Sequence, residues 1–270
     1  MEREQIRISV RNLVEFILRS GDIDNRRASL DTMEAMQAGS RLHRKIQKKM
    51  GSTYHAEVPL NIIIEEENYE LGIWGRADGI IIEETVTIDE IKGVYLSLDL
   101  LEEPIKVHLA QAKCYAYIYG IQNDLQKINV QMTYGNLDTG DLKYFSYEYT
   151  MQQLQEWFSD LILKYKKWAD FQYKWRKKRQ ASIKELAFPF PYREGQKELA
   201  AGVYRTIARK KNLFIQAPTG VGKTISTLYP AIKAVGEGLG DKIFYLTAKT
   251  VTANVAKETL GILCEKGYQA

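Results

Sequence analysis

Cysteine is scarce in this sequence. Its 270 residues include only Cys114 and Cys264, which lie far apart. Two cysteines exclude a disulfide framework, a four-cysteine zinc site and a four-cysteine iron–sulfur cluster within these residues. We expect both to be buried thiols.

Long apolar runs are also missing. No segment approaches the roughly 18 apolar residues that would cross a bilayer, and Met1-Glu2-Arg3-Glu4 does not begin a signal peptide. The hydrophobic content of 45% is nevertheless enough for a sizeable core. We therefore expect a soluble, cytoplasmic protein without membrane contact, built as one large domain or two smaller ones.

The net charge of +4 is concentrated in one stretch. Residues 164–179 hold eight Lys or Arg against one acid, interleaved with aromatic residues that include Tyr165, Trp168, Tyr173 and Trp175. This composition suits contacts with nucleic-acid phosphates, although a solvated helix end would look the same. The predicted DNA contacts in this stretch are Lys174, Arg176, Lys177, Lys178 and Arg179.

The hydrophobic pattern predicts an α/β fold class. Apolar residues at helical spacing alternate with segments of strand period, and the first strands should form a mostly antiparallel meander. The expected helices begin at Ser9 (to Gly21), Met33 (to Met50), Pro104 (to Tyr119) and Thr150 (toward Arg179). The expected strands cover 56–64, 69–74, 76–82, 85–92, 127–134 and 142–149.

A boundary is expected at Phe188-Pro189-Phe190-Pro191, which cannot continue a helix. We predict a first domain over residues 1–180, a linker over 181–191 and the beginning of a second domain over 192–270.

The second domain carries a phosphate-loop pattern. A glycine-bearing turn that ends in Lys223-Thr224 offers backbone N–H groups to triphosphate oxygens, with Lys223 reaching the phosphates and Thr224 holding Mg²⁺. An apolar strand at 212–216 and a helix after the loop complete the context. The pattern departs from the general one at its first position, where Ala217 replaces glycine. The predicted ATP contacts here are Ala217, Pro218, Thr219, Gly220, Val221, Gly222, Lys223 and Thr224.

The first domain carries carboxylates and a lysine on neighbouring strands. Asp78 lies on one strand, and Glu90 and Lys92 project from one face of the next. Asp78 and Glu90 could share a divalent cation that activates water, with Lys92 beside the attacked phosphate. Such residues also occur on ordinary exposed strands, so this pattern alone leaves both interpretations open.

Over about residues 1–178 the chain resembles the RecB-like branch of the PD-(D/E)xK nucleases. Gly39-Ser40-Arg41-Leu42-His43 and Gln111-Ala112-Lys113-Cys114-Tyr115 match the helices of that branch. The resemblance implies His43 as a further metal ligand beside Asp78 and Glu90, and Gln111 and Tyr115 facing Lys92 and the DNA backbone. It implies Mg²⁺ or Mn²⁺ as cofactor. His43 alone would equally suit a helix surface.

Over about residues 187–270 the chain resembles the start of superfamily 2 helicases of the DinG and XPD type. The resemblance rests on Phe190–Gln196, the phosphate loop and Phe244–Thr250. It implies an incomplete RecA-like parallel sheet, with Arg193 and Gln196 beside the adenine. It also implies contacts of Thr247, Lys249 and Thr250 with single-stranded DNA, although Thr247–Thr250 would also suit a helix cap.

These features together predict the N-terminal portion of an ATP-dependent DNA helicase–nuclease. No Asp-Glu-x-His box follows the phosphate loop, so these residues alone should not unwind DNA. A 5′→3′ polarity is implied by the resemblance only. One alternative is an inactive nuclease-like clamp that feeds DNA to a motor, and another is a nucleotide switch without a nucleic-acid role. We expect the region beyond Pro191 to be unstable, because an incomplete parallel sheet exposes its edges.

Overall fold

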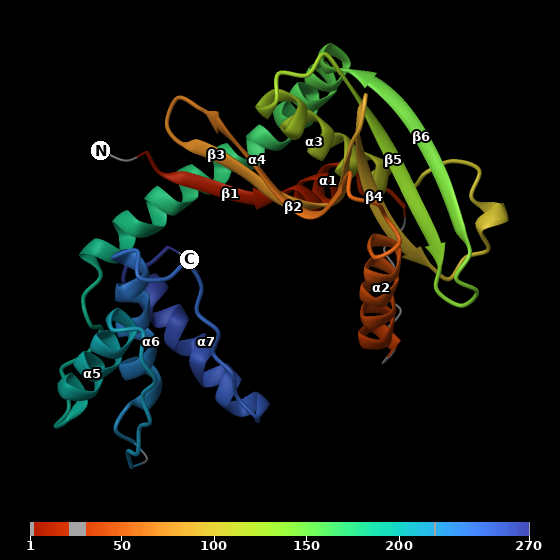
Figure 1. The fold of residues 1–270 in the computed structure, drawn as a ribbon. Helices are drawn as coiled ribbons and strands as arrows, with labels where there is room; N and C mark the ends of the chain where they lie inside the picture. Colours follow the sequence, from red (N-terminus) through yellow and green to blue (C-terminus); the bar gives the residue numbers. More distant parts are fainter. Residues whose placement is uncertain (1–2, 22–30, 219, 270) are drawn as a thin grey trace. The chain divides into compact units, whose positions relative to one another are not determined.

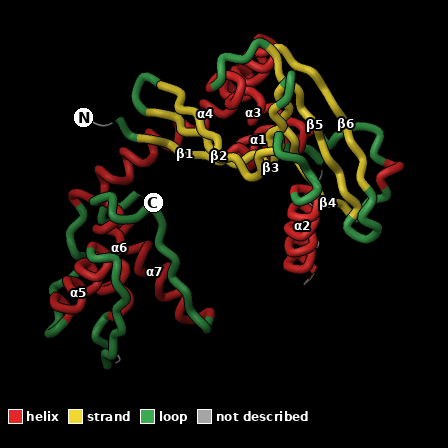
Figure 2. Tube along the Cα trace, in the orientation of Figure 1, coloured by secondary structure: helices red, strands yellow, loops and turns green. Residues whose placement is uncertain are grey.

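The structure is a computed structural model that describes residues 3–21, 31–218 and 220–269. The chain divides into two compact units, residues 1–170 and 171–270. The division falls within α4 (Met151–Glu185), a helix that continues beyond the expected end at Arg179. Figure 1 follows the chain through both units, and Figure 2 separates helix from strand.

The first unit is an α/β fold built on one mixed, six-stranded sheet with the order β1-β3-β4-β5-β6, in which β2 pairs with the other edge of β3. β1 and β3 are parallel, as are β4 and β5, while the other neighbours are antiparallel. The strands are β1 (Gln5–Ser9), β2 (Tyr54–Glu65), β3 (Glu70–Ile82), β4 (Val86–Val94), β5 (Lys127–Asn136) and β6 (Leu142–Thr150).

Two helices of this unit pack on the sheet and on each other. α3 (Lys106–Gln122) lies against β4 and β5, and α1 (Val10–Leu18) packs on α3 and β1. Small side chains such as Ala112 and Ala116 are fully buried on α3, which lets the helix approach the sheet closely. The short 3₁₀ helix η1 (Leu98–Leu100) follows β4. Within the described residues, no helix has the length and apolar character that a bilayer crossing requires.

β3 and β4 diverge at the centre of the sheet. They are paired from Ile82–Val86 to Gly79–Asp89, and beyond this point β4 continues beside β5 alone. The same edge of β3 pairs again only with β1, at Glu70–Trp74. Residues 75–78 and 90–92 therefore border an opening between two strands, where their backbone groups have no partner in the β3–β4 ladder.

The opposite edge of β3 is also interrupted at this level. The β2–β3 ladder runs from Tyr54 to Glu65 but omits the pair Glu57–Asp78. Glu57 has a φ of 58°, a left-handed conformation that costs free energy for a residue with a side chain. Asp78 thus lies between two irregular places in the sheet.

The second unit consists of α5 (Gln196–Ala208), α6 (Lys223–Gly236) and α7 (Thr250–Glu265) with the end of α4. Its core comprises Ile183, Leu186, Ile225, Ile232, Val235 and Leu263. The Lys233 ammonium group donates to the Ile183 and Lys184 carbonyls at the end of α4, at 2.9 and 3.2 Å. This contact satisfies carbonyls that a helix end leaves open.

The predicted strand at 212–216 is wrong for this structure. The described residues of the second unit contain no strand, and Phe214 and Leu246 are 96% and 88% exposed. A strand requires a neighbour that satisfies its backbone groups. Among the described residues, no strand pairs with the segment around Phe214 or with the segment around Leu246. A RecA-like sheet is therefore not part of the described structure, whereas the helix predicted after the phosphate loop is confirmed as α6.

The structure of the first unit agrees better with the helices and strands expected from the sequence. The α/β class is confirmed, and the predicted helices are confirmed as α1, α2 (Asp31–Gln47), α3 and α4. β1 was not predicted, β3 is one continuous strand rather than two, and the parallel pairs make the sheet more than a meander. Cys114 is buried as expected, but Cys264 is exposed because it lies on an outer face of α7.

Replacing Gly79 by alanine should destabilise the first unit. A Cβ at this position would come within 2.0 Å of the Tyr54 ring, whose hydroxyl donates to buried Asp89 at 3.1 Å. We expect a loss of about 2 kcal/mol in the free energy of unfolding, measured by urea denaturation. Gly51→Ala is the control, since no atom lies within 4 Å of its Cβ, and equal losses in both variants would contradict this packing.

Trypsin should cut the second unit first. The exposed basic residues Arg209, Lys210 and Lys211 precede the unpaired segment around Phe214. Mass spectrometry of a time course should show cleavage there before any cleavage within β2 to β6, because segments without packed partners open easily. A second unit as resistant as the sheet would show that these segments are held by contacts absent from this structure.

Candidate metal centre

α2 places two polar side chains over the opening in the sheet. Leu42 and Ile46, one turn apart, pack with Ile91 of β4. His43 and Gln47, each one residue further along the helix, face β3. The Gln47 amide donates to the backbone oxygen of Asp78 at 3.0 Å, so α2 is fixed to the strand at the predicted site.

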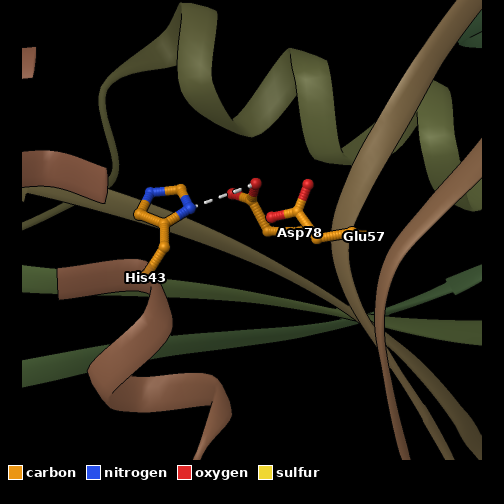
Figure 3. Close-up of side chains that lie close together, drawn as sticks. All are labelled: His43, Glu57 and Asp78. Carbon is orange, nitrogen blue, oxygen red and sulfur yellow. Dashed lines mark ion pairs between the residues drawn. The ribbon is translucent and has the colours of Figure 1, made fainter. Parts of the chain in front are cut away.

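Three potential metal ligands meet at this position. His43 Nδ1 lies 3.4 Å from Asp78 Oδ1, and one ligand atom from each of His43, Glu57 and Asp78 lies within 4.8 Å of the others. Figure 3 shows the imidazole facing the Asp78 carboxylate, with Glu57 beside it. Burial lowers the pKa of His43, but the hydrogen bond and charge of Asp78 outweigh it, so the pKa is raised.

Asp78 also bridges the diverging strands. Its Oδ2 accepts a hydrogen bond of 2.8 Å from the backbone N–H of Ile91 on β4. This side-chain contact takes the place of a ladder hydrogen bond at the point where the ladder ends. It also places Asp78 next to Glu90, and both carboxylates interact electrostatically.

Glu90 and Lys92 form a buried pair on the other side of the opening. Glu90 is 0% exposed, and Lys92 Nζ lies 2.6 Å from its Oε1. Burial raises the pKa of Glu90 to about 8, and the neighbouring Lys92 ammonium opposes this shift. Glu90 Oε2 is buried without a hydrogen-bond partner among the described residues.

α3 supplies the remaining predicted site residues. Lys92 Nζ donates to Gln111 Oε1 at 3.3 Å, and the Gln111 amide lies 3.5 Å from the Tyr115 hydroxyl. The four-residue spacing places both on the same face of α3. The structure therefore brings His43, Asp78, Lys92, Gln111 and Tyr115 to one cleft of about 930 Å³, with Glu90 buried beneath it.

The side chains present fit a divalent cation. Carboxylate oxygens and one imidazole are ligands that Mn²⁺ accepts, and oxygen ligands suit Mg²⁺. The buried Glu90 Oε2 lacks a partner, and an orphaned buried carboxylate oxygen is costly unless a donor or a cation meets it. The site is thus a candidate metal centre formed by histidine and acidic residues.

Glu57 was not predicted from the sequence. Its position on β2 matches no motif, and its carboxylate reaches the cluster through the left-handed backbone and the Gln47 amide, which donates to Oε1 at 3.2 Å. A Cβ at Gly39, one helical turn before His43, would meet no atom of the described residues within 4 Å. Among these residues, no contact requires a glycine at this position.

Asp89 and His108 lie outside the candidate ligand set. Asp89 faces the other side of the sheet, where Thr133, Tyr54 and Gln131 donate to it at 2.5, 3.1 and 3.2 Å. His108 lies beside the cleft, 3.1 Å from the Tyr134 hydroxyl. Burial, Lys92 and Arg11 lower the pKa of His108 to about 4.

The phosphate-loop residues lie in the second unit. Gly220 and Gly222 have left-handed φ angles of 86° and 75°, and α6 begins at Lys223 directly after the loop. Lys223 Nζ donates to the Ala217 and Pro218 carbonyls at 3.0 and 2.7 Å. Thr219 lies outside the described residues, and Val221 and Thr224 are half-buried.

The predicted adenine segment contacts this loop. Arg193 donates to the Gly220 carbonyl, and the Gln196 amide donates to the Val221 carbonyl at 3.2 Å. Gln196 is buried and also accepts from the Arg193 backbone N–H at 3.0 Å. The structure thus brings the two predicted ATP segments together.

The predicted DNA contacts are spread along two helices. Thr247 and Lys249 precede α7 and Thr250 is its first residue, with Lys249 N–H donating to the Thr247 hydroxyl at 3.4 Å. In α4, Arg176 and Arg179 contact Asp241 at 3.8 and 4.0 Å. The other predicted DNA contacts of α4, Lys174, Lys177 and Lys178, are exposed.

A short stretch of the chain is similar in sequence to a known protein. No family model matches the chain. A stretch of 51 residues is 51% identical to "Probable ATP-dependent helicase MJ0942" of Methanocaldococcus jannaschii, covering 18% of this chain and 8% of that protein. The chain therefore matches only a small part of its curated relative.

A solved structure is similar at a low level. "Crystal structure of SSO0001" aligns with a TM-score of 0.39 and 20% sequence identity, covering 60% of this chain and 78% of that chain. A score of this size does not establish a shared fold. The sequence match alone relates this chain to a probable ATP-dependent helicase, over 51 residues.

Proposed function

We propose that the first unit is a metal-dependent nuclease that cleaves DNA phosphodiesters. The observation that carries the proposal is the meeting of His43, Asp78 and Glu57 at the opening where buried Glu90 and Lys92 lie. His43, Asp78 and Glu90 would hold Mg²⁺ or Mn²⁺, with Glu57 as an additional acidic neighbour. The bound cation would activate a water molecule and neutralise phosphate charge.

The remaining side chains have roles that follow from their contacts. Lys92 lies between Glu90 and Gln111, at 2.6 and 3.3 Å, so its ammonium group has a defined position in the cleft, where it would lie beside the attacked phosphate. There it would stabilise the negative charge that grows as water attacks phosphorus and the P–O bond to the leaving oxygen breaks. Gln111 and Tyr115 would orient Lys92 and contact the DNA backbone.

We further propose that this nuclease works with an ATP-dependent helicase motor that begins in the second unit. The short identity to a probable ATP-dependent helicase and the phosphate loop before α6 support this proposal. ATP would bind between the loop residues, Lys223 and the Arg193–Gln196 segment. Thr247, Lys249, Thr250 and the basic residues of α4 would contact DNA.

Alanine at Glu90 or Lys92 should abolish DNA cleavage with Mn²⁺. Each variant removes one half of the buried pair, and loss of a preorganised charge costs about a hundredfold or more in rate. The measurement is cleavage of labelled single- and double-stranded DNA, with folding checked by circular dichroism. Glu148→Ala and Lys127→Ala are matched controls, because these residues form an exposed pair at 3.0 Å.

Three results are distinguishable in that experiment. Activity lost in Glu90→Ala and Lys92→Ala but kept in the controls supports the nuclease. Activity kept in all variants would contradict the assigned site. Absence of cleavage by the unaltered chain with retained DNA binding would favour the inactive clamp.

ATP binding should depend on Lys223. Its ammonium group would exchange the Ala217 and Pro218 carbonyls for phosphate oxygens, a charge-assisted contact worth about tenfold or more in affinity. The measurement is fluorescence anisotropy of a labelled ATP analogue with Mg²⁺. Lys242→Ala, in an exposed loop, is the control, and equal affinities of Lys223→Ala and the unaltered chain would contradict the assignment.

A further inference from the structure

Arg76 lies in the part of β3 that borders the opening in the sheet. It precedes Asp78 by two residues, on the edge of β3 that neither β1 nor β4 covers. Its side chain lines the same cleft as His43, Asp78 and Lys92 and is 66% exposed. An arginine in this place has access to any molecule that enters the cleft.

The backbone of Arg76 is fixed by α3. The Tyr115 ring fills the space beside Gly75, the residue before Arg76, where a Cβ would lie 2.7 Å from the ring. This close packing holds the segment of β3 at a defined distance from α3.

The side chain of Arg76 is oriented by Glu57. Arg76 Nε lies 2.6 Å from Glu57 Oε2, and Glu57 is held in turn by Gln47 at 3.2 Å. The contact uses Nε, and a guanidinium has two further nitrogens that donate hydrogen bonds in a fixed planar arrangement. Such a group matches the oxygens of a phosphate.

We propose that Arg76 binds a DNA backbone phosphate next to the one that is cleaved. This inference rests on the proposed nuclease function and assigns a substrate contact outside the predicted motifs. Hydrogen bonds join Lys92 to Gln111 and Gln111 to Tyr115, and the Tyr115 ring packs against Gly75, the residue before Arg76. The two cationic side chains are therefore spaced by one rigid set of contacts across the cleft.

The charges of the site explain why such a residue is needed. Glu57, Asp78 and Glu90 are acidic groups of the same site, and like charge repels a polyanion. The bound cation and Lys92 would act at the attacked phosphate, whereas Arg76 offsets the acidic groups at the neighbouring one. It would hold the strand without taking part in bond cleavage.

The test is binding of a fluorescein-labelled single-stranded oligonucleotide, measured by anisotropy over a range of salt concentrations with Ca²⁺ in place of Mn²⁺. Arg76→Ala should weaken binding about tenfold and lower the slope of log affinity against log salt by about one. Arg76→Lys should keep most of the slope but bind less tightly, because it keeps the charge and loses the planar fork. Mn²⁺ affinity, measured by electron paramagnetic resonance, should fall in neither variant.

Arg3→Ala is the matched control, because Arg3 also pairs with a glutamate on β2, Glu65, at 3.5 Å, but does not line the cleft. Normal affinity and slope in Arg76→Ala would overturn the inference and leave the nuclease intact. Weaker Mn²⁺ binding in Arg76→Ala would also overturn it, since Arg76 would then serve the metal centre through Glu57. If the unaltered chain neither binds nor cleaves DNA, the proposed function and this inference both fall.

Discussion

The candidate site depends on the divergence of β3 from β4. Paired strands satisfy each other's backbone groups, so these groups can bind side chains or ligands where the pairing stops. Here pairing stops after Gly79–Asp89, and the Asp78 carboxylate spans the opening to Ile91 N–H at 2.8 Å. The Asp78 side chain thus satisfies a backbone N–H of β4 with Oδ2, and its Oδ1 lies next to His43.

The acidic residues at the opening adopt arrangements that are unfavourable in free energy. Glu90 is fully buried, and burying a carboxylate is unfavourable unless cations or donors surround it. Lys92 Nζ contacts Glu90 Oε1, whereas Glu90 Oε2 has no hydrogen-bond partner among the described residues. On the far edge, Glu57 takes a left-handed backbone conformation. Irregular backbone and unsatisfied charge at one place are typical of functional sites.

The sequence predicted the parts of this site that depend on local spacing. Glu90 and Lys92 share a strand face because they are two residues apart, and Gln111 and Tyr115 share a helix face because they are four apart. Glu57 could not be predicted, because its role depends on its register with β3 and on its own φ angle. The apolar segment 212–216 is strand-like in composition, but strand formation depends on partners that composition does not reveal.

The most direct test of the account is a crystal structure of the chain grown with Mn²⁺, using the anomalous signal of manganese to locate the ion. The account predicts a peak within bonding distance of His43, Asp78 and Glu90, at the opening between β3 and β4. A well-ordered site without a peak, or a peak that these residues do not contact, would contradict it.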